Sequence, residues 1–273
     1  MDERRGAVER FFGAHAGGYA KSGSHAQGPD LAVLLDELAP KKEDLVLDVA
    51  TGTGFTAAAL APLVKHVTGI DLTFEMLDEA KKLIASKGIT NIDLRRGDAL
   101  GMEFPDATFD IITVRRATHH FRDVPGFLRE AQRVLVPGGR LGVVDMSPLE
   151  GTQEFSNEIE ILRDRSHVRA FSPAEWKSMV TGAGFQMRSA QVLGEQVSFE
   201  KWLYPVDQGG PEEASIRLAW SGTGQEVRRL LKADIREGTI HGWTKSRIIL
   251  VGIKQTGRGR KTTLRESRRR TNS

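Results

Sequence analysis

A glycine-rich turn flanked by two acidic residues is the part of this sequence best suited to binding a ligand. Asp48 lies in an apolar run, Leu45–Val49, with the length and β-branched content of a buried strand, and the small residues Ala50–Gly54 follow it. A tight glycine turn between a strand and a helix brings backbone N–H groups close to a ligand. Asp71 follows Asp48 by 23 residues, close to the ~20 expected between such a turn and an acid that binds ribose hydroxyls. The spacing predicts a nucleoside-containing ligand.

Histidines form the second group of residues that could do chemistry. His119 and His120 follow Arg115 after an apolar run, and the carboxyl ends of strands face the ligand crevice in open α/β sheets. Arg115 is therefore expected to line the pocket, and either histidine could act as a base or serve only the turn. His25 and His167 lie between the regular elements, and we expect both in the substrate pocket. The chain has no cysteine, and no metal site is expected.

The elements that must position these residues alternate between strand and helix. Predicted strands are 45–49, 67–71, 92–95, 109–114 and 139–145, and predicted helices are 55–64, 74–87 and 124–135. Alternation at this spacing indicates parallel strands joined by right-handed crossovers. A helix over 173–182, with Ser172 as its N-cap, leads to a sixth strand that ends near Val192. A last strand is predicted over 247–254.

The N-terminal segment precedes this core. Residues 3–39 hold two helical patterns around a glycine-rich loop, 13–28, that includes Tyr19 and His25. The loop either covers the ligand or is a plain flexible connection.

Two insertions decorate the core. Residues 148–171 follow the fifth strand, and residues 194–245 separate the last two strands, where a tight hairpin needs only a few residues. The longer insertion has a helical pattern over 225–235 and large aromatic side chains from Phe199 to Trp220. Such a segment is too long and apolar for a bare loop. We interpret it as a small helical cap that meets the other variable segments over the strand ends; peripheral helices that only complete the core are the alternative.

Composition indicates an ordinary globular protein. Of 273 residues, 39% are hydrophobic and 27% charged, and no run approaches the ~18 apolar residues that a membrane span requires. The charged start of the chain lacks the apolar core of a signal peptide. A cytoplasmic location follows by default. Residues 1–255 are predicted to form one domain.

Basic residues are concentrated at the C-terminus. Residues 256–273 carry seven Lys or Arg and one Glu, a net charge of +6, which leaves −3 of the total +3 for residues 1–255. A tail with almost no apolar residues is expected to be disordered. Because the body is mildly acidic, a nucleic-acid partner is not favoured, although the tail could contact RNA in a salt-dependent way.

The order of motifs resembles the class I S-adenosylmethionine-dependent methyltransferases. The motifs are DVATGTG, GIDLTFEML, LRRGDAL, FDIITVRRATHHF and LVPGGRLGVVDM. The first two are most similar to the branch of the ubiquinone and menaquinone C-methyltransferases, and the resemblance covers roughly residues 8 to 190. It implies a Rossmann-like open seven-stranded sheet, mostly parallel with the last strand antiparallel, with helices on both faces. It also implies S-adenosyl-L-methionine as the cofactor.

The resemblance assigns roles to individual residues. Asp71 would accept both ribose hydroxyls, Asp98 would contact the adenine amino group, and Asp48 would orient the glycine turn or reach the amino end of the cofactor. Ala50 stands where many relatives have glycine, and an alanine there is expected to keep a negative φ. The full set of expected cofactor-binding residues is Asp48, Ala50, Thr51, Gly52, Gly54, Asp71, Leu72, Asp98, Ala99 and Arg115.

These observations favour methyl transfer to a carbon or oxygen of a small molecule that is quinol-like, phenolic or polyketide-like. His120, His25 and His167 are the candidate catalytic residues, in an enclosed cavity of the size usual for a drug-like ligand, ~300–1,000 Å³. The alternatives are a nucleic-acid methyltransferase, a non-catalytic module that binds S-adenosylmethionine, and a nicotinamide-dependent oxidoreductase. The sequence has no G-x-G-x-x-G turn for the last of these. The oligomeric state does not follow from the sequence.

Overall fold

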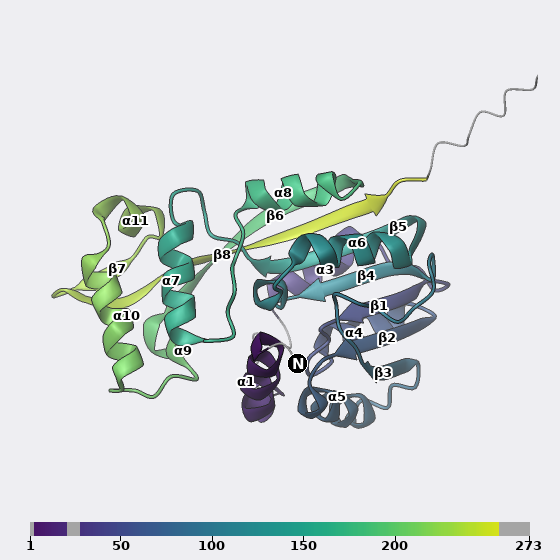
Figure 1. Ribbon diagram of the computed structural model, residues 1–273, viewed down its shortest axis with the longest axis horizontal. Coiled ribbons are helices and arrows are strands. Elements are labelled where there is room, and N and C mark those ends of the chain that lie inside the picture. The colour runs from purple at the N-terminus through teal and green to yellow at the C-terminus, as the bar shows by residue number, and fades with distance from the viewer. Residues whose placement is uncertain (1–2, 21–27, 257–273) are drawn as a thin grey trace, which may run out of the picture.

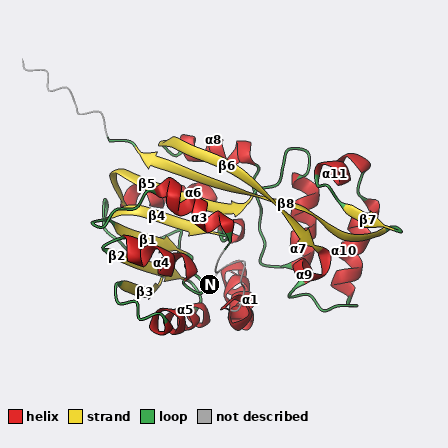
Figure 2. Ribbon diagram, turned by 180° about the vertical axis from the view of Figure 1, so that it is seen from behind, coloured by secondary structure: helices red, strands yellow, loops and turns green. Residues whose placement is uncertain are grey.

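A twisted sheet with helices on both faces forms one end of the molecule, and a smaller helical lobe forms the other (Figure 1). The computed structural model describes residues 3–20 and 28–256. His25 and residues 257–273 of the predicted basic tail lie outside these residues. Seen from behind, one long pair of strands, β6 and β8, connects the two lobes (Figure 2).

The sheet has eight strands in the order β3-β2-β1-β4-β5-β8-β6, with β7 paired to β8 off this path. The strands are β1 Leu45–Val49, β2 His66–Asp71, β3 Ile92–Arg96, β4 Phe109–Arg115, β5 Leu135–Met146, β6 Phe185–Ser198, β7 Asp234–Arg236 and β8 Thr239–Lys254. Strands β1 to β5 pair in parallel, and β8 is antiparallel to both β5 and β6. The predicted α/β fold with an antiparallel last strand is therefore confirmed, and β7 is an additional strand that the sequence did not indicate.

Helices follow the strands in the predicted order. They are α1 Glu3–Ala20, α3 Pro29–Leu38, α4 Phe55–Leu60, α5 Phe74–Ser86, α6 Val124–Val134, α7 Gln153–Arg163, α8 Pro173–Gly182, α9 Phe199–Leu203, α10 Pro211–Gly222 and α11 Gln225–Leu230, with short 3-10 helices at Ala61–Leu63 and Thr118–His120. The predicted N-cap of α8 is confirmed, since Ser172 and Glu175 form a reciprocal capping box.

Two hydrophobic layers hold the helices on the sheet. Alternate residues of a strand point to opposite faces, so Val46 packs with Leu34 of α3 and Leu60 of α4, while Leu47 belongs to the layer under α6 and α8. Trp176 of α8 lies almost fully buried in this second layer. Both faces of the parallel strands are thus covered, as their continuous apolar character requires.

Several predicted boundaries were wrong. Helix α1 continues through residues 13–20, which were expected to be loop; the stretch contains no proline, and its glycines do not end the helix. Strands β6 and β8 are longer than predicted, with Ser198 paired to Gly242, so the helical part between them occupies only residues 199–238, which we call the cap. The helix expected over 225–235 ends at Leu230, and a short strand follows.

The cap has a hydrophobic core of its own. Phe199, Trp202, Trp220 and Trp243 are all nearly fully buried there, and the Trp202 and Trp243 ring centroids are 4.8 Å apart. Helix α7 contributes Phe155 and Ile159 to this core. Since α7 belongs to the insertion after β5, both predicted insertions pack into one lobe.

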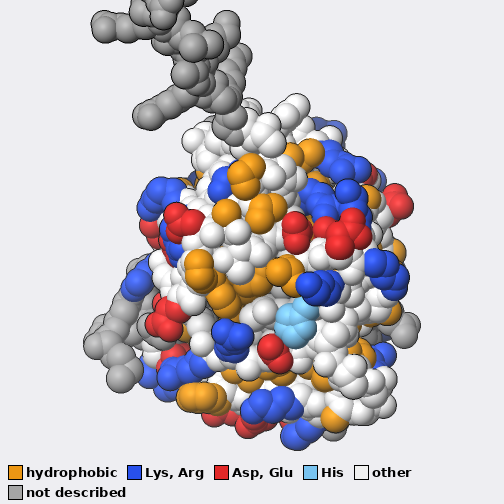
Figure 3. Space-filling model, turned by 90° about the vertical axis from the view of Figure 1, so that its right-hand side faces the viewer, with side chains coloured by type: hydrophobic (Ala, Val, Ile, Leu, Met, Phe, Trp, Pro, Cys, Tyr) orange, Lys and Arg blue, Asp and Glu red, His pale blue; other side chains and the backbone are white. Residues whose placement is uncertain are grey.

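Charge is mixed on the face that Figure 3 shows. Lys and Arg side chains there alternate with Asp and Glu side chains, and no continuous basic stripe crosses the described part of this face. None of the helices within residues 3–20 and 28–256 has the length and apolar character needed to cross a bilayer.

Candidate active site

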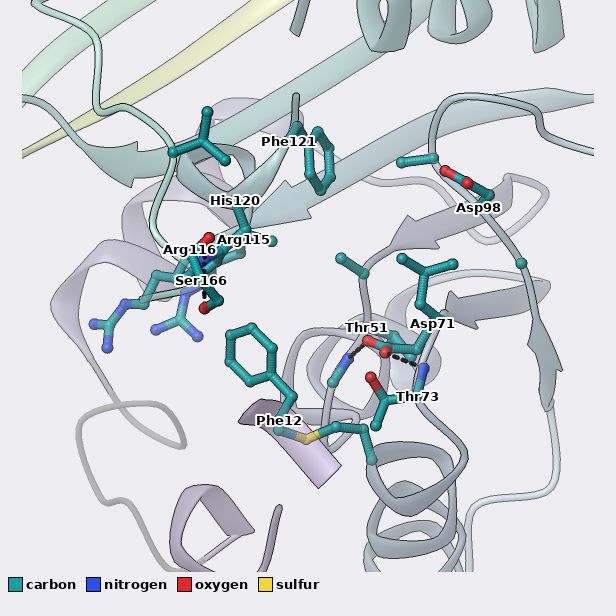
Figure 4. A pocket seen from close by; sticks show the side chains of 18 of the residues that line it. Phe12, Thr51, Asp71, Thr73, Asp98, Arg115, Arg116, His120, Phe121 and Ser166 are labelled. Atoms are coloured by element: carbon teal, nitrogen blue, oxygen red, sulfur yellow. Dashed lines mark hydrogen bonds between the residues drawn. The ribbon is translucent and has the colours of Figure 1, made fainter. Parts of the chain in front are cut away.

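One pocket of about 430 Å³ lies at the carboxyl ends of the parallel strands. Helix α1 lies between the sheet and the cap in both ribbon views, and its Phe12 forms part of the pocket wall (Figures 1, 2 and 4). Of the predicted site residues, the lining includes Asp48, Ala50, Thr51, Gly52, Asp71, Leu72, Asp98, Ala99, Arg115, His120 and His167. Residues far apart in the chain thus meet because parallel strands end at the same edge of the sheet.

The glycine turn uses three residues with left-handed backbone. Ala50, Gly52 and Gly54 have φ values of 51°, 54° and 82°. The expectation of a negative φ at Ala50 was therefore wrong; a left-handed alanine costs ~1–2 kcal/mol, which the surrounding hydrogen bonds must offset. One of them runs from Thr51 N to Ile70 O at 2.9 Å. Strain of this kind is commonly concentrated at functional turns.

Gly52 and Gly54 have different surroundings. A Cβ added to Gly52 would meet no atom within 4 Å, so its backbone faces the open pocket. A Cβ added to Gly54 would lie 3.0 Å from Ala80 Cβ on α5. Among the described residues predicted to bind cofactor, Gly54 is the one that does not line the pocket. Its glycine is needed for the turn and for packing.

Asp48 connects the glycine turn to the neighbouring strand β4. Its carboxylate accepts hydrogen bonds of 2.7 Å from the hydroxyl groups of Thr51 and Thr113, and the side chain is buried. Burial raises the pKa of Asp48 to about 6, against the opposing effect of the two hydroxyls. The carboxylate therefore joins the glycine turn to β4.

Asp71 lies at the pocket wall and accepts backbone hydrogen bonds from the glycine turn and from the residues that follow β2. Its Oδ2 accepts the backbone N–H of Gly52 at 2.8 Å, and its Oδ1 accepts that of Thr73 at 3.0 Å. Burial raises the pKa of Asp71, and these backbone donors act in the opposite direction. The Thr73 hydroxyl and the Leu72 N–H act in the same direction as these donors. The carboxylate also lines the pocket, where hydroxyl groups of a ligand could reach it.

Asp98 and Ala99 follow β3 on the opposite side of the pocket from the arginines (Figure 4). Asp98 Oδ1 accepts the backbone N–H of Leu100 at 2.9 Å, which shapes the loop. Acidic side chains thus gather in the half of the pocket formed by β1, β2 and β3. Phe12, Phe121 and His120 line the other half, beside Ser166.

Comparison with known proteins decides the class of this site. Residues 47–143 match the family described as a methyltransferase domain. A Bacillus subtilis protein named as an uncharacterized methyltransferase, YcgJ, is 36% identical over 90% of this chain and 99% of its own length. The chain belongs to the methyltransferase family. It is a class I S-adenosylmethionine-dependent methyltransferase.

Further relatives agree with this assignment. The crystal structure of YcgJ superposes on this methyltransferase with a TM-score of 0.80 at 32% identity, over 85% of this chain and all of that one. The ubiquinone/menaquinone biosynthesis C-methyltransferase UbiE of Ruegeria sp. is 34% identical over 56% of this chain and 65% of its own length. The resemblance to class I methyltransferases stated from the motifs is confirmed.

The residues present fit S-adenosylmethionine. The open backbone at Gly52 provides the close approach that the cofactor needs, and a carboxylate at the pocket wall, that of Asp71, suits ribose hydroxyls. Helix α4 has only six residues, so a cofactor carboxylate would depend on individual N–H groups more than on a helix dipole. The methyltransferase would therefore hold the adenosyl portion between the glycine turn and Asp98.

Arg115 lines the pocket, but its guanidinium binds an acid. Arg115 Nη2 and Arg116 Nε each lie 2.9 Å from the carboxylate of Asp30 in the first turn of α3. Burial alone would raise the pKa of Asp30, but the hydrogen bond from Arg115 and the charges of both guanidinium groups lower it to about 2. The cluster fixes α3 against the end of β4.

Three imidazoles gather at the acceptor side of the methyltransferase. The ring centroids of His119 and His120 are 4.0 Å apart, and those of His119 and His167 are 5.5 Å apart. His119 Nδ1 lies 2.6 Å from Asp145 Oδ1, and His120 Nδ1 lies 3.1 Å from the carbonyl oxygen of Ser166. Within the described residues, no cluster of His, Asp or Glu is arranged to hold a metal ion.

His120 and His167 are kept neutral. Burial, followed by the charge of His119, lowers the pKa of His120 well below 6.5 and that of His167 to about 3. A carbonyl oxygen only accepts hydrogen bonds, so the contact with Ser166 O places the hydrogen of His120 on Nδ1. Both rings therefore offer one lone-pair nitrogen at neutral pH.

The lowered pKa of His167 makes the stability of the protein depend on pH. Below pH 6.5 the unfolded chain binds a proton that the native His167 does not bind until about pH 3, so the free energy of unfolding falls as pH falls. Between pH 7 and pH 5 we expect the free energy of unfolding of the wild type to fall by about 2 kcal/mol more than that of His167→Gln, at 1.36 kcal/mol per pH unit below 6.5.

Urea unfolding of both proteins at the two pH values measures this difference. Asp48, with its raised pKa, acts in the opposite direction, but the comparison cancels its effect. If the free energy of unfolding changed with pH equally in the wild type and in His167→Gln, the neutral state of His167 would be contradicted.

The prediction that the cap aromatics meet over the pocket was wrong. The described lining contains none of the residues from Phe199 to Trp220, because their rings are used in the cap's own core. The cap reaches the site only indirectly: Tyr204 lies against α1, with its ring centroid 6.3 Å from that of His15.

Sequence reasoning missed part of the lining. Ile161, Arg165, Ser166 and Val168 line the pocket near His167. Arg165, Ser166 and Val168 could have been found because they lie next to His167 in the sequence. No sequence feature indicated Ile161. Phe12 falls within the first helical pattern of residues 3–39, and that pattern does not indicate that its side chain faces a ligand.

Proposed function

We propose that this protein transfers the methyl group of S-adenosylmethionine to an oxygen or carbon of a small aromatic or enolic acceptor, such as a quinol or phenol. The observation that carries the proposal is the division of one pocket into two halves. One half presents Asp48, Asp71 and Asp98 around the glycine turn, and the other presents aromatic rings and neutral histidines. The volume of about 430 Å³ suits small ligands.

Relatives support the acceptor class. Proteins named demethylmenaquinone methyltransferase are among the matches, and one from Deinococcus radiodurans is 42% identical over 38% of this chain and 43% of its own length. The matched part of such relatives is shorter than two thirds of their length, and the acceptor side of the site is built by α1 and the insertion after β5. The quinol is therefore a proposal for the class of acceptor.

The chain's own residues would place and deprotonate the acceptor. The cofactor supplies an activated methyl group, so the protein needs to align the acceptor, exclude water and remove one proton. Phe12 and Phe121 would hold an aromatic ring between them, since both line the acceptor half. His120 and His167 remain neutral beside a positively charged donor, which avoids like-charge repulsion.

A transfer assay tests this function. The protein is incubated with S-adenosylmethionine and a panel of hydroquinones, phenols and 1,3-diketones, and the products are measured as S-adenosylhomocysteine and by the mass of one added methyl group. We expect turnover on at least one acceptor with a free hydroxyl, and none on the same ring with that hydroxyl already methylated. Turnover on RNA or DNA with none on the panel would reject the proposal, and binding of S-adenosylhomocysteine without any turnover would favour a non-catalytic module.

A further inference from the structure

His167 is held by the side-chain amide of Asn157, a residue of α7 that no sequence motif indicates. Asn157 Oδ1 lies 2.8 Å from His167 Nε2 and 2.7 Å from the backbone nitrogen of Ala170. Asn157 Nδ2 donates to the backbone carbonyls of Gln153 at 2.8 Å and of Ala170 at 3.1 Å. The amide thus has partners at both ends.

These backbone partners fix the orientation of the amide. A backbone N–H can only donate and a carbonyl can only accept, so the Asn157 atom that faces the nitrogen of Ala170 must be the oxygen. An amide oxygen has only lone pairs to offer. The hydrogen in its 2.8 Å contact with His167 therefore belongs to Nε2 of the imidazole, and Nδ1 keeps the lone pair of the neutral ring.

Several titratable groups lie near His167, and the charged ones among them pair with each other. His119 and His120 face it from the turn after β4, Asp145 from β5, Glu160 from α7 and Lys245 from β8. Asp145 binds His119, and Glu160 binds Lys245. Among the described residues, 3–20 and 28–256, the His167 ring forms a hydrogen bond with Asn157 and with no other residue.

We propose that Asn157 is a positioning residue for methyl transfer, because it holds His167 as the Nε2–H tautomer and so presents Nδ1 to the acceptor. The inference rests on the proposed function, which supplies the acceptor and the proton that must be removed from it. In that step a bond forms between the acceptor atom and the methyl carbon, and the sulfur–methyl bond breaks with its electron pair left on sulfur. The proton released by the acceptor passes to Nδ1 of His167 and then to solvent. A weakly basic ring suits this task, since an acceptor that has gained a methyl group is a strong acid.

A purely structural role for Asn157 is the competing explanation, since its two donated bonds hold the loop at Ala170 and the first turn of α7. Two variants separate the roles. Asn157→Asp keeps an acceptor oxygen toward His167 and loses both donated bonds, whereas Asn157→Ala loses everything. The aspartate also keeps the bond from the N–H of Ala170, so activity has to be compared with the tautomer of His167. A structural role predicts losses of activity that do not follow the tautomer, and the positioning role predicts losses that do.

The tautomer can be read directly by NMR of the full chain with ¹⁵N-labelled imidazoles. We expect a protonated Nε2 and an unprotonated Nδ1 for His167 in the wild type and in Asn157→Asp, and a mixture in Asn157→Ala. With a working acceptor, kcat should fall about tenfold or more in Asn157→Ala, while KM stays within about twofold.

The pH profile gives an independent readout. The carboxylate of Asn157→Asp should raise the pKa of His167, so turnover should be lost as pH falls through the new value, because a protonated ring has no lone pair. Gln186→Glu adds the same charge on an exposed position of β6 and should leave the profile unchanged. An unprotonated Nε2 in the wild type, or equal losses in both Asn157 variants with an unchanged tautomer, would overturn the proposal. The labelled spectra need no acceptor, so failure of every acceptor would reject the proposed function alone.

Discussion

Asp71→Ala should weaken the binding of S-adenosylhomocysteine by about 2–3 kcal/mol, or roughly 30- to 150-fold in Kd. The loss follows from the position of the carboxylate in the pocket lining, where it would accept hydrogen bonds from the ribose hydroxyls. Hydrogen bonds to a charged acceptor contribute about 1.5–3 kcal/mol. Isothermal titration calorimetry measures the change directly, and NAD should not bind comparably to the wild type.

Asp71 also accepts the N–H groups of Gly52 and Thr73, so the variant could act only by loosening the turn. An S-adenosylhomocysteine analogue without the ribose 2′-hydroxyl separates the two effects. The wild type should prefer the natural ligand, and Asp71→Ala should not discriminate between the two. Asp93→Ala removes an acid from an exposed position of the neighbouring strand and should bind like the wild type. An equal loss for both ligands would show that Asp71 supports the turn and not the ribose.

The cofactor half of the site follows from local sequence because its geometry is local. Asp48, the glycine turn and Asp71 belong to two adjacent strands and the turn between them, so strand length and spacing bring them together. What the sequence could not indicate is the backbone at Ala50: its φ is left-handed, and the next residue, Thr51, donates its N–H to Ile70 O on the neighbouring strand. A single-residue preference cannot anticipate such a tertiary contact.

The acceptor half is assembled over long distances, and this is why its prediction was incomplete. His120 contacts Ser166, 46 residues further along the chain, through a loop with no regular pattern. The histidines were found because their residue type is informative, whereas Asn157 and Ile161 lie on a helix whose pattern suggests only an ordinary amphipathic surface. The cap was predicted as a helical unit, but its position could not be: strands β6 and β8 extend together beyond the sheet, which allows the aromatic residues to form a separate core.

The same reasoning predicts how two histidines should differ in kinetics. His167→Ala removes the lone pair that would receive the acceptor proton, so kcat should fall about 10²- to 10⁴-fold, the usual contribution of a general base. Calorimetry should show nearly unchanged binding of S-adenosylhomocysteine, since we expect the adenosyl portion to lie on the other side of the pocket, between the glycine turn and Asp98. A matched loss of cofactor affinity would contradict this assignment.

His120→Ala should act mainly on KM. Its Nδ1 is committed to Ser166, and its ring meets Phe12 edge-on with centroids 4.9 Å apart, so the side chain helps to shape the wall against which the acceptor packs. Removing it leaves a gap between α1 and the turn after β4, so the acceptor is held more loosely. We therefore expect a higher KM and a smaller change in kcat. His66→Ala, at the start of β2 and paired with Asp93, is the control that should change neither constant. If His120→Ala lowered kcat as steeply as His167→Ala while KM stayed constant, the proton would have to leave through His120, because its Nε2 is the other lone-pair nitrogen in the acceptor half.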